Sequence, residues 1–321
     1  MAAAETGGRD INFDGLPEGC VANALSLTSP EDACRLSLTG STFRSAAMSD
    51  AVWERFLPPD YRDIISRSAD AADLLASAAS KKDLYFRLCD FPVLIDGDTK
   101  SFSLEKKSGK KCYMIGSRSL KIVWSDTPKY WRWISLPHSR FLEAAELISV
   151  CWLEICGSID TTTLSPNTNY AAYLVFTLQP KPYGFEYQPL DAEMTTADNR
   201  GGAKKQTVYL DPRGAERDDG GNVSGVHAPP MAFRPRSGTR VTYRARRQAM
   251  NADLERGAAG RFPRRRSCDG WMEVELGEFF VGEGGGGEVG VRLTEINSQW
   301  KSGLVVEGIE IRPKEEEDKH M

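Results

Sequence analysis

The spacing of apolar residues changes once along the chain, near Phe91. Before this point apolar residues recur every three or four positions, as on one face of an amphipathic helix. Beyond it they alternate with polar residues or form short uninterrupted runs, which is typical of β-strands. The pattern predicts an α+β protein in two domains, a small helical one followed by a larger one of antiparallel strands.

The first two helices are predicted from their starting residues. One follows Pro17 and carries Val21 and Leu25, since proline is tolerated in a first helical turn. The other begins at Ser29-Pro30-Glu31-Asp32, which combines a capping hydroxyl, a proline at the first helical position and two acids near the positive end of the helix dipole. Gly40 is expected to end this second helix.

A third helix and a helical connector complete the first domain. The helix is predicted from Ser49-Asp50 to Pro58-Pro59 and carries Trp53. Residues 61–90 keep the helical spacing and lack the glycine and proline of a loose linker, so they are predicted to pack as a connector. Three short helices bury little apolar surface by themselves, and we expect this segment to dock on another protein.

Strand-like runs follow from residue 91 onward. They lie at residues 91–97, 110–115, 120–124, 146–156, 170–178, 271–276, 288–296 and 304–311. No helix-length pattern separates the later runs from one another. The expected architecture of this domain is therefore an antiparallel β-sandwich.

The most aromatic stretch reads SLKIVWSDTPKYWRW and begins at residue 119. Trp124 is expected to share a strand face with Leu120 and Ile122. After a Ser-Asp-Thr-Pro turn, Trp131 is expected to share a face of the next strand with Trp133. Two interpretations are open: the rings form core, because a buried tryptophan anchors a sheet by its area, or they form a platform on which sugar rings stack.

Composition narrows the class of protein. A chain of 321 residues favours two folded units, and its net charge of -4 gives no general reason to expect nucleic acid as a partner. The seven cysteines are scattered and lack zinc-ligand spacing, as in reduced cytosolic or nuclear proteins. Neither a signal peptide nor a membrane span is apparent. We expect a soluble protein of cytoplasm and nucleus, with no metal or cofactor.

Catalysis is not expected. Glu273 and Glu275 lie two residues apart on a predicted strand, and paired carboxylates catalyse glycoside hydrolysis. Alternating glutamates, however, usually form the water-facing side of a sheet. The three histidines are not near a serine or cysteine nucleophile motif.

A loop-rich insertion is predicted at residues 189–263. Only Gln206–Leu210 and Thr239–Tyr243 look like strands within it, and arginines cluster between residues 234 and 266. The cluster is interpreted as a solvated insertion or, alternatively, as a nuclear import signal or a patch for an acidic partner. Recognition of nucleic acid is not expected, because few aromatic residues interleave with the arginines.

Residues 11–57 resemble an F-box, through Leu16-Pro17, the SPEDACRLS helix and AVWERFL. An F-box is the segment by which a substrate receptor binds the Skp-type adaptor of a cullin-based ubiquitin ligase. The resemblance implies adaptor contacts at five positions: Leu16, Pro17, Val21, Leu25 and Trp53. Trp53 is also the residue best suited to pack inside the module itself.

Residues from about 110 to 313 resemble the phloem protein 2 or Nictaba-like lectins of plants. The motifs are KIVW, YWRW, VCWLEICGSI, YAAYLVF, DGWMEVELGEFF and EINSQWKSGLVVEGIEIRP, in that order. The resemblance implies a jelly-roll-like β-sandwich that binds N-acetylglucosamine oligomers or N-glycan cores. It also implies that Trp124, Trp131, Glu288 and Glu295 match the positions associated with sugar.

Geometry raises a difficulty for the two glutamates. On one regular strand, Glu288 and Glu295 would point to opposite faces and lie about 23 Å apart, so they would not touch one sugar. Trp131 is therefore expected to matter most, followed by Trp124 and Glu288, with Glu295 last. Replacement of Trp131 by alanine is expected to abolish sugar binding and leave the fold intact.

Together these expectations describe a receptor subunit of an SCF-type ligase that captures glycoproteins. The expected domains are a disordered N-terminus at 1–10, the F-box at 11–60, the connector at 61–90, the lectin-like domain at 91–313 with its insertion, and a disordered tail at 314–321. The alternative is a receptor whose sandwich no longer binds sugar and recognises a protein surface, for which the arginine-rich insertion is the candidate.

Overall fold

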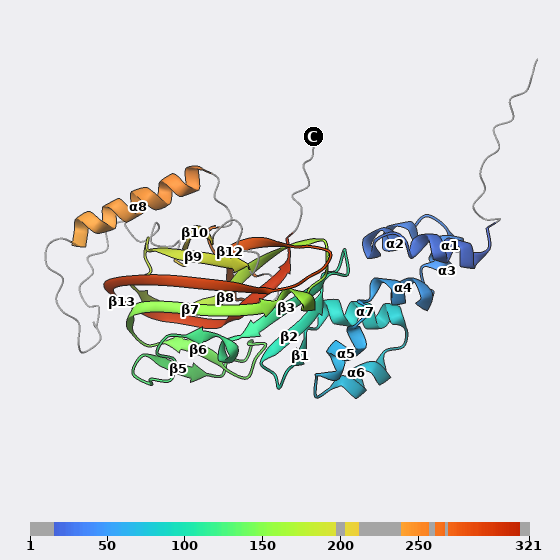
Figure 1. The fold of residues 1–321 in the computed structure, drawn as a ribbon, viewed down its shortest axis with the longest axis horizontal. Coiled ribbons are helices and arrows are strands. Elements are labelled where there is room, and N and C mark those ends of the chain that lie inside the picture. The colour runs from blue at the N-terminus through green and yellow to red at the C-terminus, as the bar shows by residue number, and fades with distance from the viewer. Residues whose placement is uncertain (1–15, 197–202, 212–238, 257–260, 267–268, 315–321) are drawn as a thin grey trace, which may run out of the picture. The chain divides into compact units, whose positions relative to one another are not determined.

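The computed structural model describes residues 16–196, 203–211, 239–256, 261–266 and 269–314. The chain divides into two compact units. Unit 1 comprises the residues up to Pro92 together with Ser103–Lys110, and unit 2 comprises Val93–Phe102 and the residues from Lys111 onward. Helices build unit 1 and antiparallel strands build most of unit 2, which confirms the predicted α+β class (Figure 1). The predicted disordered N-terminus at 1–10 lies outside the described residues, as does the predicted tail at 314–321 except for Lys314, whose backbone N–H donates a 2.9 Å hydrogen bond to the Asn169 carbonyl.

Unit 1 contains seven helices among its described residues. They are α1 (Glu18–Leu25), α2 (Pro30–Leu36), α3 (Ser41–Ala46), α4 (Asp50–Phe56), α5 (Tyr61–Ser66), α6 (Ala71–Ser77) and α7 (Lys81–Asp90). The start of α2 is as predicted: the Asp32 backbone N–H donates a 3.0 Å hydrogen bond to Ser29 Oγ. Four helices, and not the predicted three, lie in the described part of the expected F-box, residues 16–60, because the separate helix α3 follows Gly40 directly. Pattern reasoning missed α3, which is one short turn and a half without a side-chain cap.

The core of unit 1 is built around Trp53. Its side chain is fully buried, and its indole N–H donates a 2.7 Å hydrogen bond to the Ala47 carbonyl. The rings of Phe56, Tyr85 and Phe86 have centroids 5.2 to 5.5 Å from that of Trp53. Since two of these rings come from α7, the connector is packed on the helices that precede it.

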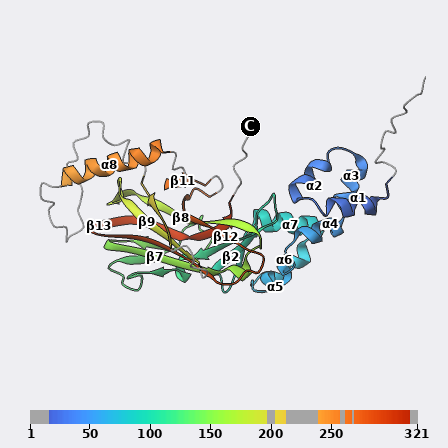
Figure 2. The same ribbon diagram turned by 45° about the horizontal axis from the view of Figure 1, so that its top comes forward.

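Unit 2 consists mainly of strands. They are β1 (Val93–Ile95), β2 (Lys100–Leu104), β3 (Lys111–Gly116), β4 (Lys121–Ile122), β5 (Trp131–Ile134), β6 (Ala144–Leu147), β7 (Val150–Asp160), β8 (Thr168–Tyr183), β9 (Pro189–Thr196), β10 (Lys204–Tyr209), β11 (Arg264–Arg265), β12 (Met272–Val281) and β13 (Glu288–Pro313). β2 also extends into the segment assigned to unit 1. The strand β13 links two groups (Figures 1 and 2). Its first half pairs with β7 and β9, and its second half pairs with β3 and β8.

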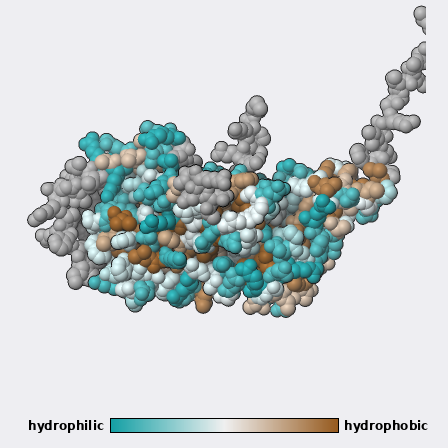
Figure 3. Space-filling view, viewed as in Figure 1, coloured by the Kyte–Doolittle hydropathy of each residue, from teal (hydrophilic) through white to brown (hydrophobic). Residues whose placement is uncertain are grey.

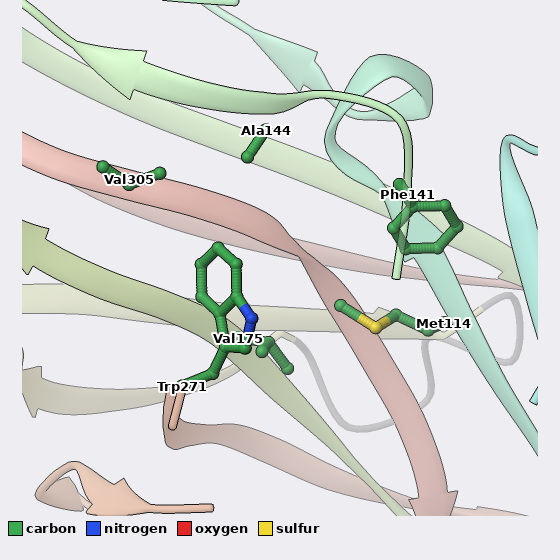
Figure 4. Packing of buried hydrophobic residues seen from close by; sticks show 6 residues of the cluster. All are labelled: Met114, Phe141, Ala144, Val175, Trp271 and Val305. Carbon is green, nitrogen blue, oxygen red and sulfur yellow. The ribbon is translucent and has the colours of Figure 1, made fainter. Parts of the chain in front are cut away.

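The two groups of strands contact each other through their inward faces. A Cβ atom added to Gly157 of β7 would lie 3.2 Å from Ile309 of β13, and one added to Gly277 of β12 would lie 2.5 Å from the sulfur of Met194 in β9. The backbones therefore come close where these glycines stand. On the opposite face of β3 and β8, Trp271 packs in a buried cluster with apolar side chains from four strands and a loop (Figure 4).

One predicted strand in the insertion is wrong. Thr239–Tyr243 lies at the start of a helix, α8 (Thr239–Glu255), although its β-branched and aromatic residues favour a strand. The helix has a partner for its apolar side, because Met250 is buried against Tyr187, Tyr209 and Phe262. The predicted strand at Gln206–Leu210 is confirmed as β10.

Candidate functional site

Four neighbouring strands of unit 2 present one solvent-facing surface, which we call the outer face. They are β4, β7, the first half of β13, and β9, in that order. Alternate residues point outward, as the pleat requires. The outward residues are Trp152, Glu154, Cys156 and Ser158 of β7, Glu288, Gly290, Arg292, Thr294 and Ile296 of β13, and Asp191, Glu193 and Thr195 of β9.

A polar cleft of about 720 Å³ lies at one end of the outer face, around Gly290. A Cβ atom on Gly290 would lie 2.6 Å from Thr195 Oγ1, so the missing side chain keeps the floor of the cleft open. Its charged lining residues are balanced, three cations and three carboxylates: Lys100, Lys121, Arg292, Asp96, Glu193 and Glu288. A cleft with donors and acceptors but no net charge suits a neutral polar ligand.

Aromatic side chains gather toward the other end of the outer face. Trp124 is 50% exposed and Trp152 is 43% exposed. The Val123 backbone N–H donates a 3.1 Å hydrogen bond to the Glu154 carbonyl, which ties the segment leading to Trp124 to β7. Tyr130 lies beside Trp124, with ring centroids 6.0 Å apart. This aromatic end therefore combines exposed rings with the polar side chains of the neighbouring strand.

The alternation predicts that Trp124 shares a strand face with Leu120 and Ile122. In the structure it does not. The strand β4 ends at Ile122, and Trp124 has a φ of 65°, in the left-handed region. This conformation is rare for a non-glycine residue and turns the side chain out of register. Trp124 is consequently exposed, whereas Leu120 and Ile122 are buried.

Trp131 lies inside unit 2. Its side chain is 2% exposed, and its indole N–H donates a 3.1 Å hydrogen bond to the Val123 carbonyl. The neighbouring Trp133 is partly covered by Arg118, whose guanidinium carbon lies 3.8 Å from the ring centre. The geometry of Trp131 matches the core interpretation of the aromatic stretch, whereas Trp133 is only half-buried.

Glu288 and Glu295 are on opposite faces of β13. The strand is regularly paired between them, with Glu288 opposite Asp160 and Glu295 opposite Leu153. Glu288 is exposed at the rim of the polar cleft. Glu295 is buried, forms an ion pair with Lys301, and accepts a 3.0 Å hydrogen bond from Gln188 Nε2. The structure therefore separates the two glutamates, as the spacing argument expected.

Burial has the largest effect on the pKa values of the ion pair between Glu295 and Lys301. It raises the pKa of Glu295 and lowers the pKa of Lys301, and the attraction between the two partly offsets both effects. Lys301 Nζ also donates to the Cys151 carbonyl at 3.0 Å and to the Gln299 carbonyl at 2.9 Å. These hydrogen bonds stabilise the backbone where the pairing of β7 with β13 is interrupted, between Ile296 and Lys301.

The four residues expected to bind sugar do not form one compact site. Val123, next to Trp124, is bonded to Glu154, which is opposite Thr294 of β13. Thr294 is six residues from Glu288, or about 20 Å along a strand. Trp124 and Glu288 therefore belong to the two ends of the outer face, whereas Trp131 and Glu295 belong to the interior.

Sequence reasoning missed Trp152. The apolar run around it suggested a strand covered on both sides, which hid the outward position of its indole. The signal was the alternation of the strand: Leu153 and Ile155 are fully buried, and Trp152, Glu154 and Cys156, which alternate with them, face out.

Of the two glutamates considered for catalysis, Glu273 and Glu275, the first is engaged in ion pairs. Glu273 is buried and accepts hydrogen bonds from Arg312 at 2.6 and 2.8 Å and from Arg264 at 2.7 Å. Arg312 and Arg266 also bind the buried Glu310. Glu273 therefore belongs to an internal network of ion pairs and not to a water-facing pair with Glu275.

Two features, clusters of metal ligands and membrane-spanning helices, are absent from the described residues. None of their histidine, cysteine and carboxylate side chains form a group of three or more that could hold a metal ion. The described helices include none with the length and apolar character needed to cross a membrane.

The residues expected to contact an adaptor fall into two sets. Leu16, 46% exposed, and Pro17 lie at the surface of unit 1, just before α1. Val21, Leu25 and Trp53 are buried within the unit. Other exposed apolar side chains in the first four helices and their loops are Leu27, Leu38 and Met48.

Comparisons with known proteins identify the family. The family model of phloem protein 2 matches residues 110–313. The chain belongs to the phloem protein 2 family. It is 40% identical to F-box protein PP2-B1 of Arabidopsis thaliana over 315 residues, covering 95% of this chain and 91% of that protein. It is 42% identical to F-box protein PP2-B15 of the same plant over 303 residues, covering 93% and 96% of the two chains.

The similarity extends over both units, because these relatives align with more than nine tenths of the chain. A third relative, F-box protein VBF of Arabidopsis thaliana, is 40% identical over 302 residues and is covered to 99% of its length. These names confirm the resemblance to F-box proteins of the phloem protein 2 type in plants. The chain is thus an F-box protein with a phloem protein 2 domain.

Proposed function

We propose that this protein is the substrate-recognition subunit of an SCF-type ubiquitin ligase, and that its β-sandwich binds carbohydrate on target glycoproteins. The observation that carries the proposal is the outer face, where the exposed ring of Trp152 on β7, with Trp124 in the segment after β4, accompanies a charge-balanced cleft. Ubiquitin transfer then follows from proximity, without catalytic side chains of this chain.

The adaptor is bound by unit 1. Leu16 and Pro17 supply the exposed contact before α1, together with apolar side chains such as Leu27 and Leu38 that otherwise face water. Val21, Leu25 and Trp53 act on this contact by fixing the helices that carry it. The partners are a Skp-type adaptor and, through it, a cullin scaffold.

The glycan is bound by the outer face of unit 2. Exposed indole rings stack on the C–H faces of sugars, and the cleft supplies hydrogen bonds to hydroxyl groups. Because Trp124 and Glu288 lie about 20 Å apart along the strands, the face fits an oligosaccharide better than a single sugar. N-acetylglucosamine oligomers or N-glycan cores are the ligands to test first.

The cytoplasm and nucleus are the proposed locations. The six cysteines among the described residues are all free of disulfides, which fits a reducing compartment. Such a location would bring the receptor to glycoproteins outside the secretory pathway.

The proposal is tested by copurification and a glycan array. The full chain is coexpressed with a Skp-type adaptor, and we expect a complex that the Leu16→Ala and Pro17→Ala double variant does not form. Leu75→Ala, which changes an exposed leucine on α6, is the matched control and should leave the complex unchanged. The purified complex is then applied to an array that displays N-acetylglucosamine oligomers and N-glycan cores.

A folded complex that binds no glycan on the array would favour the second candidate, recognition of a protein surface. One observation supports this candidate. Residues 239–256 contain five arginines and two carboxylates, in a chain of net charge -4. Hydrophilic side chains gather over α8 (Figure 3), and Arg244 and Arg256 are exposed there. An acidic protein partner would then be expected to bind more weakly as salt rises.

A further inference from the structure

Trp152 is held in place on the outer face by its neighbours. Its indole N–H donates a 2.9 Å hydrogen bond to Glu154 Oε2, two residues along β7. The other carboxylate oxygen of Glu154 accepts a 3.0 Å hydrogen bond from Arg292 of β13. The indole is thereby linked to a charge-assisted pair that bridges two strands.

The indole nevertheless keeps much of its surface open. Trp152 is 43% exposed, although a large aromatic ring on a sheet is usually covered. Directly opposite it in the β7–β13 register stands Ile296, which is 56% exposed. Two exposed apolar side chains thus lie side by side on adjacent strands, next to a carboxylate and a guanidinium.

This arrangement has the parts that sugar binding requires. A pyranose presents a flat apolar patch of C–H groups and a rim of hydroxyl groups. An open indole provides the stacking surface, and Glu154 and Arg292 offer acceptors and donors at its edge. Fixing the indole before binding lowers the conformational entropy that is lost when the ligand stacks on it.

The direction of the strand connects Trp152 with the polar cleft. Outward residues continue along β7 from Trp152 through Glu154 and Cys156 to Ser158, and the last two line the cleft around Gly290. Trp152 and Ser158 are six residues apart, or about 20 Å. A linear oligosaccharide laid along β7 would contact both.

We infer that Trp152 is a stacking platform for one sugar of an oligosaccharide that extends along β7 into the cleft, and that Glu154 and Arg292 are its positioning residues. The inference rests on the proposed carbohydrate binding and adds the residue and the direction of the ligand. Trp124, at the adjacent edge of the face, contacts the same or the next sugar.

The experiment is calorimetric titration of the full chain with N-acetylglucosamine trimer and, separately, with a high-mannose N-glycan core. We expect Trp152→Ala to weaken binding of the recognised probe by about thirtyfold or more, as truncation of an aromatic hot spot does. Trp152→Phe keeps a ring but cannot form the hydrogen bond to Glu154. Its loss of affinity, expressed as the logarithm of the fold-change, should be roughly a third or less of the loss in Trp152→Ala.

One further variant and a second readout separate positioning from bulk structure. Glu154→Gln keeps an acceptor for the indole N–H but loses the charge that holds Arg292, and should weaken binding by about threefold to tenfold. Tryptophan fluorescence supplies the second readout: saturating ligand changes the emission of the wild type, and this change is reduced in Trp152→Phe. A merely structural Trp152 would lower the unfolding midpoint and leave the ligand-induced change in place.

The outcomes are distinguishable. If Trp124→Ala loses binding while Trp152→Ala stays within about twofold of the wild type, the inference about Trp152 is overturned and carbohydrate binding stands. If the wild type binds neither probe and no glycan on the array, the proposed carbohydrate binding fails and this inference fails with it.

Discussion

The inward and outward faces of β13 carry similar residues with different tasks. On the inward face, Glu295 is buried in an ion pair with Lys301. On the outward face, Glu288 stands exposed at the rim of the cleft, and Arg292 reaches across to Glu154. In the first half of β13, strand parity therefore separates the roles of the two glutamates: the inward Glu295 serves the fold, and the outward Glu288 is available to a ligand.

The largest expected effect is on the inward face. Replacing Lys301 by methionine leaves the buried Glu295 without its cation, and should lower the free energy of unfolding by about 3 to 5 kcal/mol. Urea denaturation of the full chain measures the change. Adding Glu295→Leu should recover much of the loss, because both buried charges are then gone. A single variant as stable as the wild type would contradict the internal role of this pair.

The tryptophans provide the same contrast. Trp131→Ala removes a side chain that is 2% exposed and should lower the free energy of unfolding by about 3 to 5 kcal/mol. Trp124→Ala removes a half-exposed ring and should change it by no more than about 0.5 kcal/mol. Thermal unfolding of the two variants makes the comparison. Equal stability losses would break the division into an inner and an outer tryptophan.

Acid should weaken unit 2 through its buried carboxylates. Burial alone would raise the pKa of Glu310, but Arg266, Arg140 and Arg312 lower it to about 2. Because the folded pKa is below the unfolded value, the stabilisation is present above an ordinary glutamate pKa of about 4.3 and is lost as pH falls toward 2.

The loss from Glu310 amounts to about 3 kcal/mol. Burial raises the pKa of Glu307, which works in the opposite direction. Urea unfolding at several pH values tests the effect, with Glu310→Gln as the variant and Glu288→Gln as the exposed control. We expect the acid sensitivity to shrink in the first variant alone, and an unchanged slope there would refute this assignment.

The smallest expected effect belongs to the outward glutamate. Glu288→Gln keeps the size of the side chain and should leave stability unchanged, while glycan binding weakens by about 1 kcal/mol through one altered hydrogen bond. Calorimetry with the best glycan from the array provides the number. A stability loss comparable to that of Lys301→Met would erase the difference between the two faces.

Much of the fold was predictable because its signals are local. Ser29 caps α2 as its sequence indicates, and the alternation along residues 288–295 predicts that Glu288 and Glu295 face opposite ways. Two signals were not local. Trp124 leaves its strand through a left-handed φ that alternation does not encode, and α8 is a helix because Met250 finds buried partners.

The site was harder to predict than the fold. Exposure of Trp152 depends on which face of β7 remains uncovered, and this is decided by the arrangement of β4, β13 and β9 around it. An apolar run such as VCWLEIC looks the same whether one face or both are covered. Family resemblance likewise marked positions without showing that Trp131 and Glu295 point inward.

The most direct test of the receptor account is ubiquitin transfer to a defined cargo. The protein is assembled with adaptor, cullin and the activating and conjugating enzymes, and is offered one high-mannose glycoprotein before and after enzymatic removal of its glycan. We predict modification of the glycosylated form only, and its loss with Trp124→Ala. Equal modification of both forms, or none of the glycosylated form while the receptor itself is ubiquitinated, would contradict the account.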